Sequence, residues 1–127
     1  MAKIENFEDI KSWQRARELT NLIYDLTSVS PFSRDFELRN QIRRASGSIM
    51  HNIAEGFDAG SNPEFIRFLR IARRSASEVQ SQLYLALDRK YIDQNDLKTA
   101  YAIAAEIKKL INALVTYLKK SSKQTTS

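Results

Sequence analysis

The sequence contains no cysteine and only one histidine, and few glycines or prolines interrupt it. Without cysteine the chain has no disulfide framework, no thiol nucleophile and no thiolate ligand for a metal ion. A catalytic arrangement that depends on imidazole could use only His51. The sequence also has no glycine-rich phosphate loop and no Gly-x-Ser-x-Gly nucleophile elbow. We therefore expect a protein that is not an enzyme and that has neither a cofactor nor a metal site.

Long hydrophobic runs are missing as well. The longest stretch without a charged residue is the ten-residue segment ASGSIMHNIA, which is about half as long as a membrane-spanning helix must be. The first ten residues carry three acids and no apolar run, so they do not predict a signal peptide. The sequence therefore predicts no membrane partner and a cytoplasmic location.

The composition that remains is typical of a soluble globular protein. Apolar residues make up 43% and charged residues 28% of the 127 residues, which is enough chain for one domain with a modest core. The formal net charge is +5. A positive surplus of this size favours polyanionic partners, although many proteins share it.

Apolar residues recur at spacings of three and four in four segments, which is the pattern of amphipathic helices. We expect Ser33 and Asn62 to cap the second and third helices, and Gly56 to end the second. No strand-like alternation is present. The sequence predicts an all-α, antiparallel up-down four-helix bundle. The expected helices cover residues 10–28, 33–56, 62–88 and 96–120.

These helices define the expected domain organisation. Residues 1–120 form a single four-helix-bundle domain, and residues 121–127 form a polar, disordered tail. The last helix has a wider apolar stripe than one seam requires, because of Ile103, Leu110, Val115 and Tyr117. This surplus indicates either contact with another copy of the chain or a helix that is buried more deeply than the others.

The third predicted helix carries a row of arginines opposite its apolar stripe. The row lies within about 120° of arc, and no acid occurs between Phe65 and Ser77. The planar arginine fork suits phosphate recognition. The alternative is a solvated helix face whose positive charge is balanced by acids of the next helix or of another subunit. The candidate nucleic-acid-binding residues are Arg67, Arg70, Arg73, Arg74, Lys108 and Lys109, with additional help from Lys119 and Lys120.

A polar strip runs beside the apolar stripe of the second helix, and a matching strip lies on the third. Two antiparallel helices would bring these strips together as a hydrogen-bonded structural network with an Arg44–Glu78 ion pair. Arg43 and His51 are expected to point outward. A ligand site at the same residues is the alternative. The predicted network consists of Gln41, Arg44, Ser48, Asn52, Glu55, Ser75 and Glu78.

Three segments resemble a known family in order and spacing. They are WQRA at residues 13–16, QIRRASGSIMHNIAEG at 41–56 and EFIRFLRIARRSASEVQSQLYLA at 64–86. The chain resembles the bacterial 23S ribosomal RNA intervening-sequence proteins over residues 7–118. This resemblance implies an all-helical bundle that assembles into a ring-like homopentamer, without catalytic residues. The chain also looks similar to the accessory proteins of diversity-generating retroelements, which are basic pentamers that bind nucleic acid and a reverse transcriptase.

Two positions depart from the family pattern. Members often have Gly-Ser where this chain has Arg74-Ser75, and often a basic residue near Ala59. The first departure adds charge to the arginine row, and the second removes a cation from the following loop. The leading hypothesis is an oligomeric bundle that binds RNA or another polyanionic nucleic acid. The alternative is a scaffold that binds only proteins.

Overall fold

A computed structural model describes residues 4–126 of the chain, with side chains described through Ser121. It consists of four long helices, which confirms the predicted all-α four-helix class, and the described residues contain no strand. Short 3-10 turns, η1 and η2, precede the first and second helices. The elements are η1 (Phe7–Asp9), α1 (Lys11–Thr27), η2 (Phe32–Arg34), α2 (Phe36–Asp58), α3 (Asn62–Asp88) and α4 (Gln94–Thr126).

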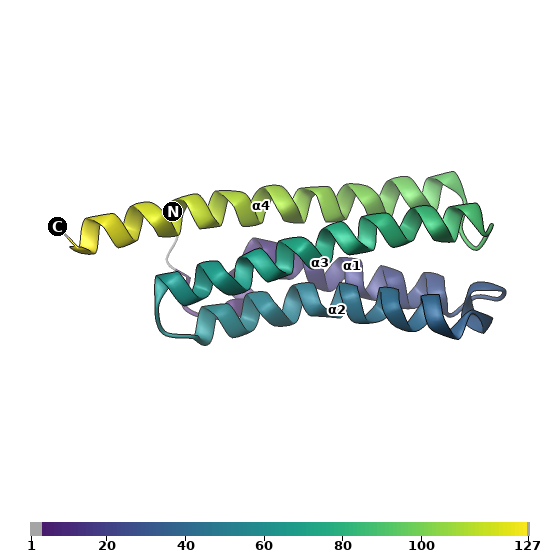
Figure 1. The fold of residues 1–127 in the computed structure, drawn as a ribbon, viewed down its shortest axis with the longest axis horizontal. Coiled ribbons are helices and arrows are strands. Elements are labelled where there is room, and N and C mark those ends of the chain that lie inside the picture. The colour runs from purple at the N-terminus through teal and green to yellow at the C-terminus, as the bar shows by residue number, and fades with distance from the viewer. Residues whose placement is uncertain (1–3, 127) are drawn as a thin grey trace.

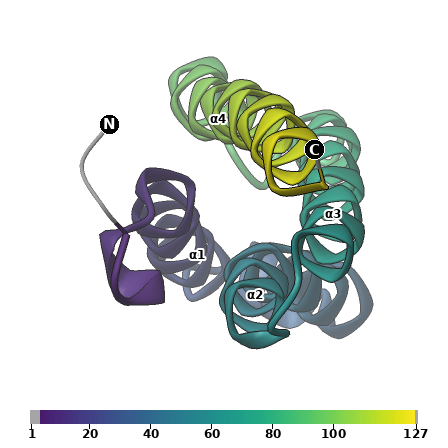
Figure 2. The ribbon, with the colours of Figure 1, turned by 90° about the vertical axis from the view of Figure 1, so that its left-hand side faces the viewer.

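The helices lie side by side and alternate in direction, as Figure 1 shows. Seen end-on in Figure 2, they are arranged around one core in the order α1, α2, α3, α4. The α2–α3 interface is the most extensive of the helix pairs. The first and last helices are joined across the bundle by Arg15, which forms ion pairs with Glu18 on its own helix and with Glu106 on α4. The arrangement leaves the outward face of every helix open to solvent.

The core consists of the apolar stripes that the sequence spacing predicts. Burying an aliphatic side chain of this size stabilises the fold by about 1.5–3 kcal/mol, so these stripes dominate the stability of the bundle. Large aliphatic side chains without exposed surface come from all four helices: Leu19, Ile23, Ile42, Ile49, Ile53, Leu69, Val79, Leu83, Ile107 and Ile111.

Both predicted helix N-caps are wrong by a small shift. Ser33 lies within η2, and the side chain of Asp35 caps α2 by accepting a hydrogen bond from Leu38 N at 3.1 Å. Ser61, not Asn62, caps α3. Each segment offers two adjacent polar residues of capping type, and the geometry of the preceding turn decides which of them accepts the bond.

Asp35 is also expected to make stability depend on pH. Hydrogen bonds from Leu38 N and from the Tyr91 hydroxyl lower the pKa of this carboxyl below its ordinary value of 3.8. A carboxyl whose pKa is lower in the folded state stabilises the fold above its unfolded pKa, and the contribution disappears as the pH falls through the folded pKa. We expect Asp35→Ala to lower the free energy of unfolding by about 1 kcal/mol at pH 7.

Urea unfolding of the native chain and the variant, at neutral pH and at an acidic pH, measures this difference. It should shrink as the pH falls through the folded-state pKa, because the native carboxyl then becomes protonated. A difference of equal size at both pH values would contradict the assignment. Tyr91→Phe, which removes the 2.9 Å bond from the hydroxyl to Asp35, serves as the partial control.

Gly56 does not end α2, contrary to the prediction. The helix continues to Asp58, and Gly56 is buried where α2 crosses α3. A Cβ atom at this position would lie 2.7 Å from Phe68 Cβ and 2.9 Å from Phe65 Cδ1. The glycine is therefore needed for close helix packing. The left-handed residue of the α2–α3 connection is Gly60, with a φ of +88°.

The last helix begins at Gln94 and is longer than predicted. Four residues were expected to widen its apolar stripe. Of these, Val115 is buried, Ile103 and Leu110 are half-buried, and Tyr117 is 47% exposed. The predicted polar tail falls almost entirely on residues whose side chains lie outside the described part, so it stays a prediction. Within residues 4–126, every helix is too short or too polar to span a bilayer.

Candidate nucleic-acid interface

The arginines predicted as a row lie along the outer side of α3. Arg67, Arg70 and Arg74 are exposed, and Arg73 is half-buried at the edge next to α4. Residues at i, i+3 and i+7 follow one face of a helix. The row therefore exists as a surface feature, but its members differ in their partners.

Arg67 is compensated by an acid that lies just before the row. Its Nη2 atom is 3.0 Å from Glu64 Oε2, and its Nε atom donates to both carboxylate oxygens. The hydrogen bond from Arg67 lowers the pKa of the Glu64 carboxyl, and the same bond raises the pKa of Arg67. The guanidinium also lies 4.5 Å from the centre of the Phe68 ring. Arg67 therefore offers less positive charge than the rest of the row.

Two other cations are held by neutral amides. Arg73 Nη1 donates to Asn112 Oδ1 at 2.6 Å, across the α3–α4 seam. Lys108 Nζ on α4 donates to Gln80 Oε1 at 3.1 Å. Gln80 itself is only 7% exposed and also donates from Nε2 to the carbonyl of Tyr101 at 3.5 Å. An amide fixes the position of a cation without neutralising its charge.

The remaining candidate cations are exposed and have no ion pair among the described side chains. These are Arg70, Arg74 and Lys109, and the same holds for Lys119 and Lys120 on α4. The single acid of α4 between residues 97 and 120 is Glu106, which pairs with Arg15 on the α1 side. We define the basic tract as Arg70, Arg73, Arg74, Lys108 and Lys109.

The structure brings together the centre of the predicted polar network. Ser75 Oγ on α3 donates to Ser48 Oγ on α2 at 3.0 Å. Asn52 Nδ2 donates to the Ser48 carbonyl at 2.8 Å and lies 2.9 Å from its hydroxyl. All three side chains are half-buried at the α2–α3 seam. Because one hydroxyl bonds across the seam, these residues fix how α2 and α3 are aligned.

The outer members of the predicted network do not join it. Gln41, Arg44, Glu55 and Glu78 are exposed. The described side chains form no Arg44–Glu78 ion pair, so this prediction is wrong. Arg44, Glu78 and Gln41 instead line one shallow hollow together with Gln82. Long side chains at the rim of a seam remain solvated, and pairing them in water gains little.

Arg43 was predicted to point outward, but it lies across the α1–α2 seam. Its Nε atom donates to Thr27 Oγ1 at 2.8 Å, and its Nη2 atom donates to Ser28 Oγ at 3.3 Å. The guanidinium lies 4.5 Å from the centre of the Tyr24 ring. A helical wheel of α2 alone could not show that these partners lie on α1 and at its C-terminal end. His51 is exposed, as predicted.

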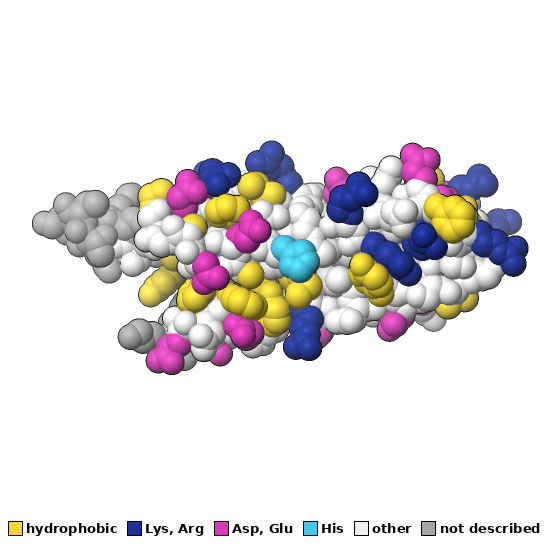
Figure 3. All heavy atoms as spheres, turned by 90° about the horizontal axis from the view of Figure 1, so that it is seen from below, with side chains coloured by type: hydrophobic (Ala, Val, Ile, Leu, Met, Phe, Trp, Pro, Cys, Tyr) yellow, Lys and Arg dark blue, Asp and Glu magenta, His cyan; other side chains and the backbone are white. Residues whose placement is uncertain are grey.

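A hollow of about 570 Å³ opens beside Arg43, on the outer face of α2 next to Tyr24 of α1. Figure 3 shows this face, with the single histidine near its centre and most of its basic side chains on the right half. Most of the acids on this face lie on the left half. The lining residues are Tyr24, Asn40, Arg43, Arg44, Gly47, Ser48, His51 and Asn52. This lining contains no carboxylate, and the sequence patterns did not single it out as a unit.

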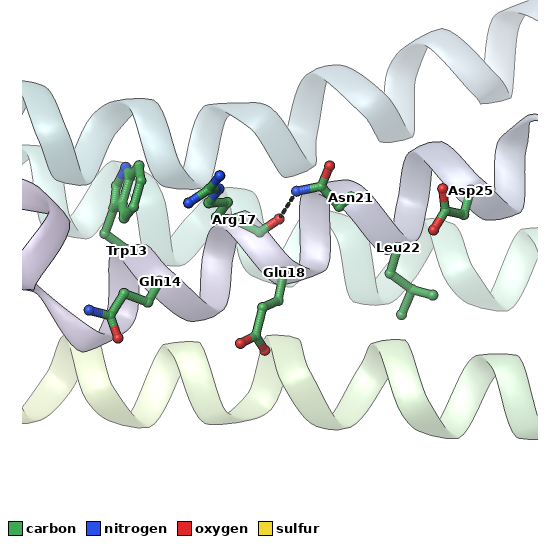
Figure 4. A pocket seen from close by; sticks show the side chains of 7 residues that line it. All are labelled: Trp13, Gln14, Arg17, Glu18, Asn21, Leu22 and Asp25. Carbon is green, nitrogen blue, oxygen red and sulfur yellow. Dashed lines mark hydrogen bonds between the residues drawn. The ribbon is translucent and has the colours of Figure 1, made fainter.

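A second hollow of about 520 Å³ runs along the outer side of α1 (Figure 4). Arg17 lies 5.9 Å from the Trp13 ring, and its carbonyl accepts a hydrogen bond from Asn21 at 2.9 Å. Glu18 and Asp25 also line this hollow. These two carboxylates make it a poor site for an anion. Across the described residues, no three His, Asp or Glu side chains are placed to hold a metal ion.

Comparisons with known proteins agree with this architecture. The family model of the 23S rRNA-intervening sequence protein matches residues 8–113. The chain is similar to a crystal structure of a protein with unknown function from the S23 ribosomal protein family of Bacteroides thetaiotaomicron. The two share 25% sequence identity at a TM-score of 0.76, over 83% of this chain and 95% of the other. No curated protein matches the chain. Because the family model covers most of the sequence and the fold agrees, the chain belongs to the 23S rRNA-intervening sequence protein family.

Proposed function

We propose that the chain is a non-enzymatic, cytoplasmic, oligomeric bundle protein that binds RNA through the basic tract. The observation that carries this proposal is that none of the five cations in the tract is neutralised. Arg73 and Lys108 are bonded to neutral amides, and Arg70, Arg74 and Lys109 are exposed without an ion pair. A cluster of uncompensated arginines and lysines on adjacent helices is suited to a phosphate backbone.

The tract favours backbone contact over base readout. Its side chains lie on the outer sides of two helices and at the seam between them, where they would meet phosphates along a strand. The family description, which refers to ribosomal RNA, is consistent with an RNA partner. The resemblance to this family further supports a homopentamer, in which one tract per subunit would multiply the number of phosphate contacts.

A scaffold that binds only proteins is the second candidate, and exposed aromatic side chains on α3 and α4 favour it. Tyr84 and Tyr101 lie with their ring centres 5.8 Å apart, and they are 51% and 36% exposed. Leu85 is 49% exposed on the same helix as Tyr84. Exposed aromatic surface of this kind is enriched at protein interfaces.

Binding of a single-stranded RNA across a salt series separates these candidates. Removing three phosphate contacts with Arg70→Ala, Arg73→Ala and Arg74→Ala should reduce the slope of log K against log salt by about 2 and weaken binding about 100-fold near 0.1 M salt. Lys11→Ala, Arg17→Ala and Arg34→Ala together form the control, because they remove the same charge from α1 and η2.

The control variant should bind more tightly than the tract variant, with a slope close to that of the native chain. Equal losses in both variants would mean that only net charge matters. If the native chain does not bind RNA at all, the proposal fails and the scaffold candidate remains. The solution mass of the native protein tests the pentamer separately.

A further inference from the structure

The hollow on the outer face of α2, beside Tyr24 of α1, has a lining that suits a small ligand with an anionic and an aromatic part. Its lining combines two arginines, a histidine, two asparagines and a tyrosine ring, without a carboxylate. At about 570 Å³, its size is within the usual range of small-molecule sites. The neighbouring hollow on α1 has a similar size but includes two acids. The absence of acids therefore distinguishes the first hollow from an ordinary surface depression.

One wall of this hollow is already ordered. Arg43 is fixed by Thr27 and Ser28, and its guanidinium lies over the ring of Tyr24. Two of its donors are used in these bonds, which leaves others for a ligand. Tyr24 is 47% exposed. A guanidinium and a tyrosine ring together present a flat surface of the kind on which nucleic-acid bases stack.

Other residues of α2 supply further polar groups to the hollow. Arg44 and His51 are exposed at the rim, and the described contacts give neither of them a hydrogen bond or an ion pair. Both hydrogens of the Asn52 amide are directed to Ser48, so its carbonyl oxygen remains an acceptor. A phosphate at the rim and a base at the flat wall would each find groups of the right kind.

Gly47 points to a ligand at this hollow independently of the chemistry of its lining. It lies in the middle of α2, where glycine destabilises a helix by about 1 kcal/mol relative to alanine. Packing does not require it, because an added Cβ would meet only the His51 ring, at an ordinary distance of 3.8 Å. Gly47 lines the hollow. A residue that weakens the helix and serves no internal packing indicates that the space above it is used.

We propose that this hollow is a nucleotide subsite for single-stranded RNA. The phosphate would lie against Arg44 and Arg43, and the base would lie against the Arg43–Tyr24 wall. The ligand class rests on the proposed RNA function, but the subsite belongs to α1 and α2, whereas the basic tract belongs to α3 and α4. Figure 2 shows that these two pairs of helices occupy different sides of the bundle. The subsite thus adds a preference for unpaired nucleotides to a backbone interface.

Gly47→Leu tests the subsite because it fills the hollow without entering the core. We expect its melting temperature to rise by about 3 °C, since leucine is a better helix former than glycine. Its affinity for a short single-stranded oligoribonucleotide should fall about tenfold. Its affinity for an RNA duplex of equal length should stay unchanged. Tyr24→Ala should weaken single-strand binding similarly, and Tyr24→Phe should restore it.

Each remaining outcome is decisive. If Gly47→Leu binds single strands with the affinity of the native chain, the subsite is overturned. A solution mass of Gly47→Leu that differs from that of the native chain also overturns it, because the difference would show that another copy of the chain occupies the hollow. Titration of the native protein with adenosine monophosphate, followed by amide NMR, tests the subsite independently of the tract. Shifts at Gly47 and His51 without shifts at Arg70 and Arg74 support it, and no shift at Gly47 overturns it. If the tract variant loses RNA binding and Gly47→Leu does not, the proposed function is supported and the subsite is overturned.

Discussion

Replacement of Phe32 by alanine is expected to lower the free energy of unfolding by about 3–5 kcal/mol, the range for removing a large buried ring. Phe32 is only 1% exposed, although it lies in η2, outside the four long helices. Its ring stacks on Tyr91 at a centre-to-centre distance of 5.1 Å and an interplanar angle of 27°. The loss should be large because this ring closes one end of the core. Urea unfolding followed by circular dichroism measures the change.

Phe36→Ala is the matched control, four residues further along the chain. Its ring is 64% exposed, and Arg39 lies over it at 4.8 Å. Removing a ring that water already reaches should cost less than about 0.5 kcal/mol, plus a small cation–π contribution. Similar losses in Phe32→Ala and Phe36→Ala would contradict the role that the structure gives to η2.

Replacement of Gly56 by leucine should destabilise the bundle by about 3 kcal/mol, because overpacking forces neighbouring side chains and backbone to move. Even a Cβ would approach Phe68 Cβ to 2.7 Å and the backbone oxygen of Phe65 to 3.3 Å. The two phenylalanines belong to the first turns of α3, so the helix itself would have to shift. Thermal unfolding of the purified variant, or its failure to accumulate as folded protein, measures the effect.

Gly47→Leu is the control on the same helix. Its added Cβ meets only the His51 ring, at 3.8 Å, so this variant should be more stable than the native chain. Replacement by leucine is thus expected to lower the free energy of unfolding at Gly56 and to raise it at Gly47. Losses of equal size at Gly47 and Gly56 would show that the space around the two glycines does not differ in the way described.

The sequence was sufficient to predict the helices, because helical periodicity is a local property that a one-dimensional pattern contains. It was insufficient for Phe32, whose burial depends on Tyr91 in the distant α3–α4 connection. Gly56 was misjudged for a related reason. A glycine near the end of a helical pattern fits both a C-terminal stop and a close crossing, and only the position of α3 decides between them.

The candidate sites show the same limit at the level of side chains. A helical wheel placed the arginines on the outer face of α3, but it could not show that Glu64 neutralises Arg67 while Asn112 holds Arg73. It also assigned Arg43 to solvent, although Thr27 accepts its hydrogen bond from the neighbouring helix. Partners that lie on another helix require the packing of the two helices, which the pattern of one helix does not contain.

The amide partners of the basic tract have a consequence for conformational entropy. A free arginine or lysine loses about 1.5–2 kcal/mol of rotamer freedom when a ligand immobilises it. Arg73 and Lys108 have already lost much of that freedom to Asn112 and Gln80 during folding. An anion that binds them therefore contacts side chains that are already ordered. The entropy cost of ordering these side chains lowers the stability of the free protein and does not lower the affinity of the complex.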